Sequence, residues 1–284
     1  MIVGRTSLDA IAIEDGQQHW TYAEVEARVV AFTVRLKEQG SRVLATLLDN
    51  STAWLVADFA ALRAGVVHVP LPGFFTPEQL MHAMSASGAD TLLTLPQLAA
   101  RWPEAPCAAC EVAGQGLAML RLPGRTAPMP EATAKITFTS GTTGTPKGVC
   151  LTAAAMDRVA DGLVKAMEPL DIRRHLCALP FAVLLENVAG LMAPLRRGAT
   201  CIALPLQSLG LSGSSAFDPR RFQEAVVGQQ PDSLILLPQM LPAWAACLAA
   251  WRCSSVASRA QATAGNRGPA IPAGNGSRAV CRTQ

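Results

Sequence analysis

The sequence predicts an α/β fold in which mostly parallel sheets are flanked by helices. Over residues 20–95, short hydrophobic runs typical of strands alternate with segments whose apolar residues recur at helical spacing. Helix start and stop signals stand at the ends of these helical segments. The chain has 284 residues, 50% of them hydrophobic and 16% charged, which is the composition of a globular protein with a sizeable core.

The first helix is predicted from Thr21 onward. Thr21 and Glu24 stand at the spacing of a capping box, in which each side chain accepts a hydrogen bond from the other residue's backbone N–H. An apolar stripe then runs from Val25 to Leu36, and Gly40 stands where a helix is expected to end. A buried strand is predicted next, at residues 43–48.

Two more helices are predicted in the first hundred residues. Asn50 or Ser51 can cap a helix that reaches Ala64 and ends at Gly65. Thr76 can cap another, because proline follows at the first helical position and glutamine at the third. Strands are predicted at residues 66–70 and 91–94.

The pattern changes after residue 100. Residues 101–134 are rich in Pro, Ala and Gly and are predicted to be a loop-dominated connection. A strand at 135–139 leads into a Gly/Thr-rich loop, and a strand at 148–151 returns from it. Thr152 and Asp218 are predicted to cap two further helices. Later strands are expected at residues 176–179, 199–204 and 233–237.

The formal net charge of +3 comes from the last part of the chain. From Arg252 onward there are five arginines and no acid, which leaves 19 basic against 21 acidic residues before that point. A nucleic-acid-binding surface is therefore not indicated.

The N-terminus does not resemble a signal peptide, and no run of about 18 apolar residues predicts a transmembrane helix. The eight cysteines form no recognisable disulfide or metal framework. Cys107 and Cys110 are interpreted as loop thiols, with a metal or redox pair as the alternative. These observations predict a cytoplasmic protein.

A loop rich in hydroxyl groups and glycine, within Thr137–Gly148, points to chemistry. Glycines let backbone N–H groups approach a polyanion, hydroxyls add donors, and lysine adds a mobile positive charge. It is not a Walker loop, because Pro146 precedes the lysine and a glycine follows it. A surface turn with an incidental lysine is the alternative. The predicted phosphate-binding residues are Thr139, Ser140, Gly141, Thr142, Thr143, Gly144 and Lys147.

This loop resembles the signature motif of the adenylate-forming superfamily. That family includes acyl-CoA synthetases, aryl-CoA ligases, luciferases and peptide-synthetase adenylation domains. The resemblance covers roughly residues 8–251, is strongest toward acyl-CoA synthetases, and includes further segments in the family's order. These segments are Trp20–Glu24, Ala61–Pro70, Leu179–Thr200 and Pro231–Pro238.

The resemblance implies ATP-dependent activation of a carboxylic acid. The acid would attack the α-phosphate of ATP to give an acyl-adenylate and pyrophosphate, and a thiol, commonly coenzyme A, would then displace AMP. The loop would hold the β- and γ-phosphates, with Mg²⁺ neutralising the triphosphate. No catalytic residue and no protein ligand for a metal is identified in the sequence.

Phe181, Val183 and Glu186 are the predicted substrate-pocket residues, within a stretch that resembles the family's acyl-pocket segment. Ala182 and Val183 stand where many relatives have histidine or an aromatic residue, so an apolar, fatty-acid substrate is favoured. Two alternatives remain open: the stretch is simple core, and Glu186 lies on a solvated helix edge.

Segments that the family uses later in its chain are not recognised here. No Tyr-Gly-x-Thr-Glu-like or Gly-Tyr-Gly-like segment is found, and Lys165 is the last lysine. We therefore expect residues 1–251 to be a partial, truncated N-terminal adenylation domain, weakly active or inactive. Residues 252–284 are expected to be a disordered or out-of-frame tail. The alternatives are a non-catalytic nucleotide- or partner-binding remnant, the N-terminal half of a split ligase whose other half is separately encoded, and an unrelated P-loop NTPase.

Overall fold

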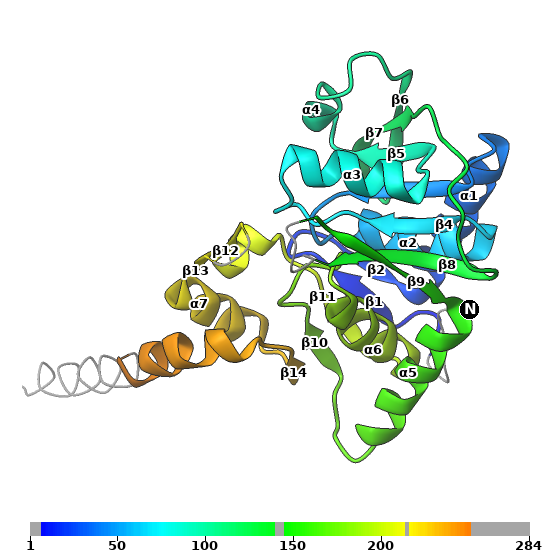
Figure 1. Ribbon diagram of the computed structural model, residues 1–284. Coiled ribbons are helices and arrows are strands. Elements are labelled where there is room, and N and C mark those ends of the chain that lie inside the picture. Colours follow the sequence, from blue (N-terminus) through cyan, green and yellow to red (C-terminus); the bar gives the residue numbers. More distant parts are fainter. Residues whose placement is uncertain (1–6, 140–144, 214–215, 251–284) are drawn as a thin grey trace, which may run out of the picture.

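The computed structural model describes residues 7–139, 145–213 and 216–250. These residues form alternating layers of helices and sheets (Figure 1). Helix α3 covers the outer face of a seven-stranded sheet, and α1 and α2 lie between that sheet and a five-stranded sheet. Helix α7 packs on the far face of the five-stranded sheet. The α/β class is confirmed.

The seven-stranded sheet has the order β6-β7-β5-β3-β4-β8-β9. Its centre, from β5 through β3 and β4 to β8, is parallel. Each edge is an antiparallel hairpin, so this sheet is parallel only in its middle. The strands are β3 (Val43–Leu47), β4 (Val67–Pro70), β5 (Thr91–Thr94), β6 (Cys107–Val112), β7 (Gln115–Arg121), β8 (Thr133–Thr139) and β9 (Lys147–Thr152).

The five-stranded sheet has the order β14-β10-β11-β1-β2 and is parallel except for the β1–β2 pair. A separate two-stranded ribbon consists of β12 (Leu211–Ser212) and β13 (Ala216–Phe217). The strands of the larger sheet are β1 (Ile11–Glu14), β2 (His19–Thr21), β10 (Arg174–Leu176), β11 (Thr200–Ile202) and β14 (Ser233–Leu234).

The predicted helix caps are confirmed. In α1 (Tyr22–Glu38) the side chains of Thr21 and Glu24 form the expected capping box. In α2 (Thr52–Ala64), Ser51 rather than Asn50 is the N-cap, and Gly65 ends the helix with φ +71°. In α3 (Pro77–Ser87), Thr76 and Gln79 form a second capping box.

The remaining helices lie mostly in the second half of the chain. Thr152 and Asp218 cap α5 and α7 as predicted. The segment η1 is a π-helical turn that continues directly into α6. The bounds are α4 (Pro96–Ala99), α5 (Ala153–Ala166), η1 (Glu186–Met192), α6 (Ala193–Arg197), η2 (Leu206–Leu209), α7 (Pro219–Gln229), η3 (Pro238–Met240) and a helical segment over 241–250.

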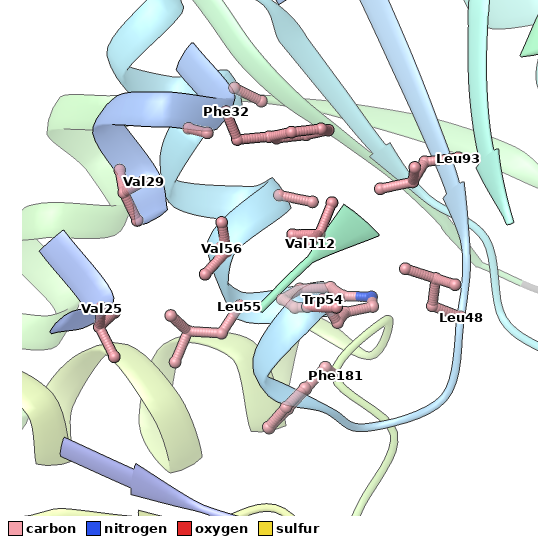
Figure 2. Close-up of a cluster of buried hydrophobic side chains, with 14 of the residues drawn as sticks. Val25, Val29, Phe32, Leu48, Trp54, Leu55, Val56, Leu93, Val112 and Phe181 are labelled. Atoms are coloured by element: carbon pink, nitrogen blue, oxygen red, sulfur yellow. The ribbon is translucent and has the colours of Figure 1, made fainter. Parts of the chain in front are cut away.

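The core between the two sheets is built on Trp54 of α2, which is fully buried. Figure 2 shows this side chain among Leu48, Val112 and Phe181. The ring centroids of Trp54 and Phe181 are 5.2 Å apart. Because aromatic side chains contribute large buried areas, this contact joins α2 firmly to the segment that follows β10.

The prediction that residues 101–134 are a loop-dominated connection missed one regular element, although most of these residues are outside helices and strands. This element is the hairpin β6–β7, which turns at Ala113 and Gly114, both with positive φ. Cys107 and Cys110 are therefore strand residues rather than loop thiols. Residues three apart in a strand point to opposite faces, so these two thiols do not converge on one ligand.

Strands β1 and β2 were not predicted from the sequence. Among the described residues, no helix has the length and apolar content needed to cross a bilayer. The boundary at residue 251 and the tail 252–284 lie outside the described residues and stay predictions.

Candidate functional site

The β8–β9 hairpin places two of the predicted phosphate-binding residues opposite each other. Thr139 ends β8, Lys147 begins β9, and the two are paired across the strands. Both side chains are exposed. A hydroxyl and a mobile cation thus stand side by side where the chain leaves and re-enters the sheet. The other five predicted residues, Ser140, Gly141, Thr142, Thr143 and Gly144, lie outside the described residues.

Gly148 is required by packing within this hairpin. A Cβ atom at this position would lie 2.9 Å from Cγ2 of Ile136 and 3.0 Å from Cζ of Phe138. Both neighbours are buried side chains of β8. The missing side chain lets β9 lie tightly against β8, which holds Lys147 in its register opposite Thr139.

Helix α3 contacts the returning end of the loop. Nε2 of His82 donates a hydrogen bond of 3.0 Å to the carbonyl oxygen of Pro146, the residue before Lys147. The His82 ring also packs edge-on against Phe138, with 6.4 Å between ring centroids. The position of Lys147 is therefore set by a strand on one side and by a helix on the other.

A buried polar network lies beneath the hairpin. Nζ of Lys135, on β8, is 2.7 Å from Oδ1 of Asp58 on α2 and also donates to Oδ1 of Asn187 on η1. Nδ1 of His68 lies 2.6 Å from the same Asp58 oxygen, and Nε2 of His68 is 2.9 Å from Oγ1 of Thr46. The network joins β3, β4, β8, α2 and η1.

The charges within this network follow from burial and pairing. Burial alone would raise the pKa of Asp58, but the charges of Lys135 and His68, together with their hydrogen bonds, lower that pKa below its ordinary range. Burial lowers the pKa of His68, and the Asp58 carboxylate offsets this only in part. Neutral His68 then donates from Nδ1 to Asp58 and accepts from Thr46 at Nε2.

A cavity of about 10 Å³ borders Asp58, His68 and Lys135. This is about the volume that one water molecule needs, and too small for a nucleotide or an acyl group. We therefore interpret the network as support for β8 rather than as a substrate site.

The three predicted substrate-pocket residues do not share one environment. Phe181 is buried against Trp54, and Val183 is half-buried. Glu186 is fully buried at the start of η1, which excludes the alternative of a solvated helix edge. Burial raises the pKa of Glu186, which lies 3.9 Å from Nε2 of His175. The assignment of these residues to a substrate pocket stays a prediction.

The groups described at the hairpin end fit a triphosphate. Lys147 supplies positive charge and Thr139 supplies a hydroxyl donor, both exposed, and these are groups that recognise phosphate oxygens. A hairpin anchored in a seven-stranded sheet keeps the two groups in a fixed relation. Such an arrangement can stabilise negative charge that develops on a leaving pyrophosphate.

Sequence reasoning did not identify the supporting groups. Lys135 was the clearest sequence signal of a buried polar group, because a lysine inside a hydrophobic strand is unusual. In the structure this residue is 3% exposed. Its partners Asp58 and Asn187 stand 129 residues apart in the chain, so no local pattern connects them.

Comparison with known proteins gives a family match. A model of the family described as "AMP-binding enzyme" matches residues 3–267. Feruloyl-CoA synthase from Amycolatopsis sp is 29% identical over an alignment of 292 residues, covering 98% of this chain and 55% of that protein. The chain therefore spans about half the length of this curated relative.

Solved structures share the fold. O-succinylbenzoate coenzyme A synthetase from Bacillus subtilis in complex with AMP has a TM-score of 0.60 at 21% identity, covering 83% of this chain and 60% of that one. The same synthetase with ATP and magnesium ion has a TM-score of 0.57 at 21% identity, covering 80% and 59%. A malonyl-CoA ligase with methylmalonyl-CoA and AMP bound has a TM-score of 0.55 at 26% identity, covering 78% and 44%.

Proposed function

The chain belongs to the AMP-binding enzyme family, and from this premise we propose that its β8–β9 loop binds the triphosphate of ATP during activation of a carboxylic acid. Its fold is that of the N-terminal domain of adenylate-forming enzymes. The proposed chemistry is attack of the carboxylate on the α-phosphate, with release of pyrophosphate, followed by transfer of the acyl group to a thiol.

The observation that carries this proposal is the pairing of Thr139 with Lys147 at the end of an anchored hairpin. In the proposed role, Lys147 and Thr139 contact the β- and γ-phosphates together with Ser140, Gly141, Thr142, Thr143 and Gly144. A preorganised donor that stabilises developing charge contributes about 3–4 kcal/mol to catalysis. Mg²⁺ is proposed to neutralise the triphosphate, since ATP and magnesium ion occupy a structure of the same fold.

Coenzyme A is the proposed thiol, and the acid is proposed to carry an apolar acyl group. Support comes from the aliphatic pair Ala182 and Val183, which follow Phe181 near the core. A fatty acid fits such a surface. One relative is a feruloyl-CoA synthase, so ferulate is the aryl acid to compare with fatty acids of several lengths.

A second proposal concerns how far the reaction proceeds on this polypeptide. The chain covers 55% of the feruloyl-CoA synthase length, and the family's later segments are not recognised in its sequence. We propose that these 284 residues bind ATP but turn over weakly or not at all without a complementary polypeptide. A non-catalytic remnant and the N-terminal half of a split ligase both fit this proposal, and addition of a complementary C-terminal half distinguishes them.

Two measurements on the 284-residue chain test these proposals. Calorimetric titration with a non-hydrolysable ATP analogue and Mg²⁺ should give binding that Lys147→Ala weakens at least tenfold. The matched control is Lys165→Ala, which removes an exposed lysine from α5. Absence of binding, or equal binding by both variants, overturns the assignment of the loop. ATP–pyrophosphate exchange above background with fatty acids or ferulate overturns only the proposed inactivity.

A further inference from the structure

Three side chains with metal-binding atoms meet in the core beside the five-stranded sheet: His175, Cys177 and Glu186. One ligand atom from each lies within 4.8 Å of the others, and all three residues are buried. His175 belongs to β10 and Cys177 follows its end, so the two share one face of the chain at strand spacing. Glu186 comes from the first position of η1.

Some of the polar atoms of this cluster have no hydrogen-bond partner. Among the described residues, eight buried side-chain nitrogen or oxygen atoms make no hydrogen bond, and three of them are here. These are Nε2 of His175 and both carboxylate oxygens of Glu186. Buried polar groups in proteins are nearly always paired, so three unpaired atoms in one cluster indicate an occupant.

The second ring nitrogen of His175, Nδ1, has the kind of hydrogen-bond partner that a metal-bound histidine usually has. Nδ1 of His175 lies 2.8 Å from Oγ of Ser233. When Nδ1 donates to that hydroxyl, Nε2 carries a lone pair directed toward the Glu186 carboxylate, 3.9 Å away. Two lone pairs face each other without stabilisation unless a proton or a metal ion lies between them. A hydrogen bond from the second ring nitrogen is the usual support of a metal-bound histidine.

Local backbone also makes room for the carboxylate. A Cβ on Gly190 would lie 2.5 Å from Oε1 of Glu186, so glycine is needed one turn along η1. The Cys177 thiol approaches the carbonyl oxygen of Gly190 at 3.4 Å, and the Cys201 thiol approaches the same oxygen at 3.8 Å. Single-turn π-helical insertions such as η1 are frequent at functional sites.

We propose that His175, Cys177 and Glu186 bind one divalent transition-metal ion of the zinc class, with nitrogen, sulfur and oxygen as donors. This donor set favours zinc over magnesium or calcium, which prefer oxygen ligands. One thiolate and one carboxylate balance the two positive charges of the ion. Binding releases the thiol proton to solvent, together with the carboxyl proton when Glu186 is protonated.

All three residues are buried, and the role proposed for the ion is structural. The ion joins the end of β10 to the start of η1, and these flank the segment that contains Phe181 and Val183. Burial raises the pKa of Cys177 and of Glu186, which is the behaviour of these groups without a cation. The inference does not depend on ATP binding, and its failure leaves the proposed function untouched.

The test uses the reduced 284-residue chain carrying Cys107→Ser, which removes an exposed thiol. The chain is stripped of metal and titrated with Zn²⁺ against a chromogenic chelator. We expect one Zn²⁺ per chain and a melting temperature that rises with Zn²⁺. Cys177→Ser and Glu186→Gln should each weaken binding at least tenfold. Cys110→Ser, at a buried thiol on β6, is the matched control and should bind normally.

If a variant does not fold, Co²⁺ in place of Zn²⁺ still tests the site, because this measurement needs only the unsubstituted cluster. Co²⁺ bound to the unsubstituted cluster should show thiolate-to-metal charge-transfer absorption. Binding without that absorption, equal Zn²⁺ affinity in Glu186→Gln, or no Zn²⁺ binding at all overturns the proposal. A melting temperature that responds to pH but not to Zn²⁺ also overturns it, because the pair His175–Glu186 then shares a proton instead of a metal.

Discussion

Nε2 of His82 lies 3.0 Å from the carbonyl oxygen of Pro146, so helix α3 is bonded to the residue that precedes Lys147. A carbonyl oxygen only accepts, which makes His82 the donor. The bond joins an element on the outer face of the seven-stranded sheet to the end of the proposed phosphate loop.

Replacement of His82 with alanine should weaken ATP binding several-fold without unfolding the chain. The lost hydrogen bond is worth about 0.5–1.5 kcal/mol, and its loss allows Pro146 and Lys147 to move. Calorimetric titration with an ATP analogue measures the affinity, and thermal melting checks the fold. Met81→Ala, at an exposed neighbouring position on α3, is the control. Unchanged affinity in His82→Ala would show that α3 does not position the loop.

Gly148→Ala should destabilise the fold by about 1–3 kcal/mol, because the new Cβ would lie 2.9 Å from Ile136 and 3.0 Å from Phe138. Gly162→Ala is the matched control, since nothing lies within 4 Å of a Cβ at that exposed position in α5. The control should gain up to about 1 kcal/mol from helix propensity. Urea denaturation measures both variants, and a stable Gly148→Ala would refute the packing argument.

Lys135→Met should cost about 3–5 kcal/mol, because it leaves the Asp58 carboxylate buried with no cation beside it. The hydrogen bonds that Asp58 keeps come from neutral His68 and the Asn187 amide. Adding Asp58→Asn to this variant should restore part of the loss, since the unpaired charge is then gone. Lys165→Met, at an exposed lysine, should change stability by less than about 0.5 kcal/mol. Equal losses at Lys135 and Lys165 in urea denaturation would contradict the ion pair.

Stability should fall as the pH drops from 7 to 5, in part because of His68. Burial lowers its pKa in the folded chain from the ordinary value of 6.5, so the unfolded chain takes up the proton first. The contribution of neutral His68 to stability is complete above pH 6.5, the ordinary pKa of histidine. This contribution is lost as the pH falls from 6.5 through the lower pKa of His68 in the folded chain. The pKa of Asp58 is also lowered, so Asp58 titrates below this window.

The measurement is the free energy of unfolding at several pH values for three chains. His68→Gln should reduce the slope between pH 5 and 7, whereas His19→Gln, at an exposed histidine, should keep it. A slope that survives in His68→Gln would assign the pH dependence to other groups.

The sequence was most informative where structure is local. The capping boxes of α1 and α3 each lie within a few residues, and both formed as predicted. The hairpin β6–β7 was missed because its turn uses Ala113 with φ 51°, a conformation that alanine rarely adopts. Pairing across the sheet overrode that local preference.

At the candidate site, the same distinction between local and long-range structure applies. Thr139 and Lys147 could be selected because the loop motif is contiguous, and the hairpin confirms only that they are neighbours. Glu186 was expected either in a pocket or on a solvated edge, yet it lies buried beside His175 and Cys177. Those contacts arise from the way η1 returns over β10, which residue spacing does not reveal.

The parallel pairing of β1 with β11 has a kinetic consequence. Thr200 donates a hydrogen bond to the carbonyl oxygen of Ile11, 189 residues earlier in the chain. Synthesis proceeds at about 5–20 residues per second, so β1 leaves the ribosome about 10–40 seconds before its partner exists. All strands of the seven-stranded sheet lie within residues 43–152, so this sheet can assemble in that interval. The apolar stretch at Ile11–Glu14 is thus the part of the nascent chain for which chaperone protection should matter longest.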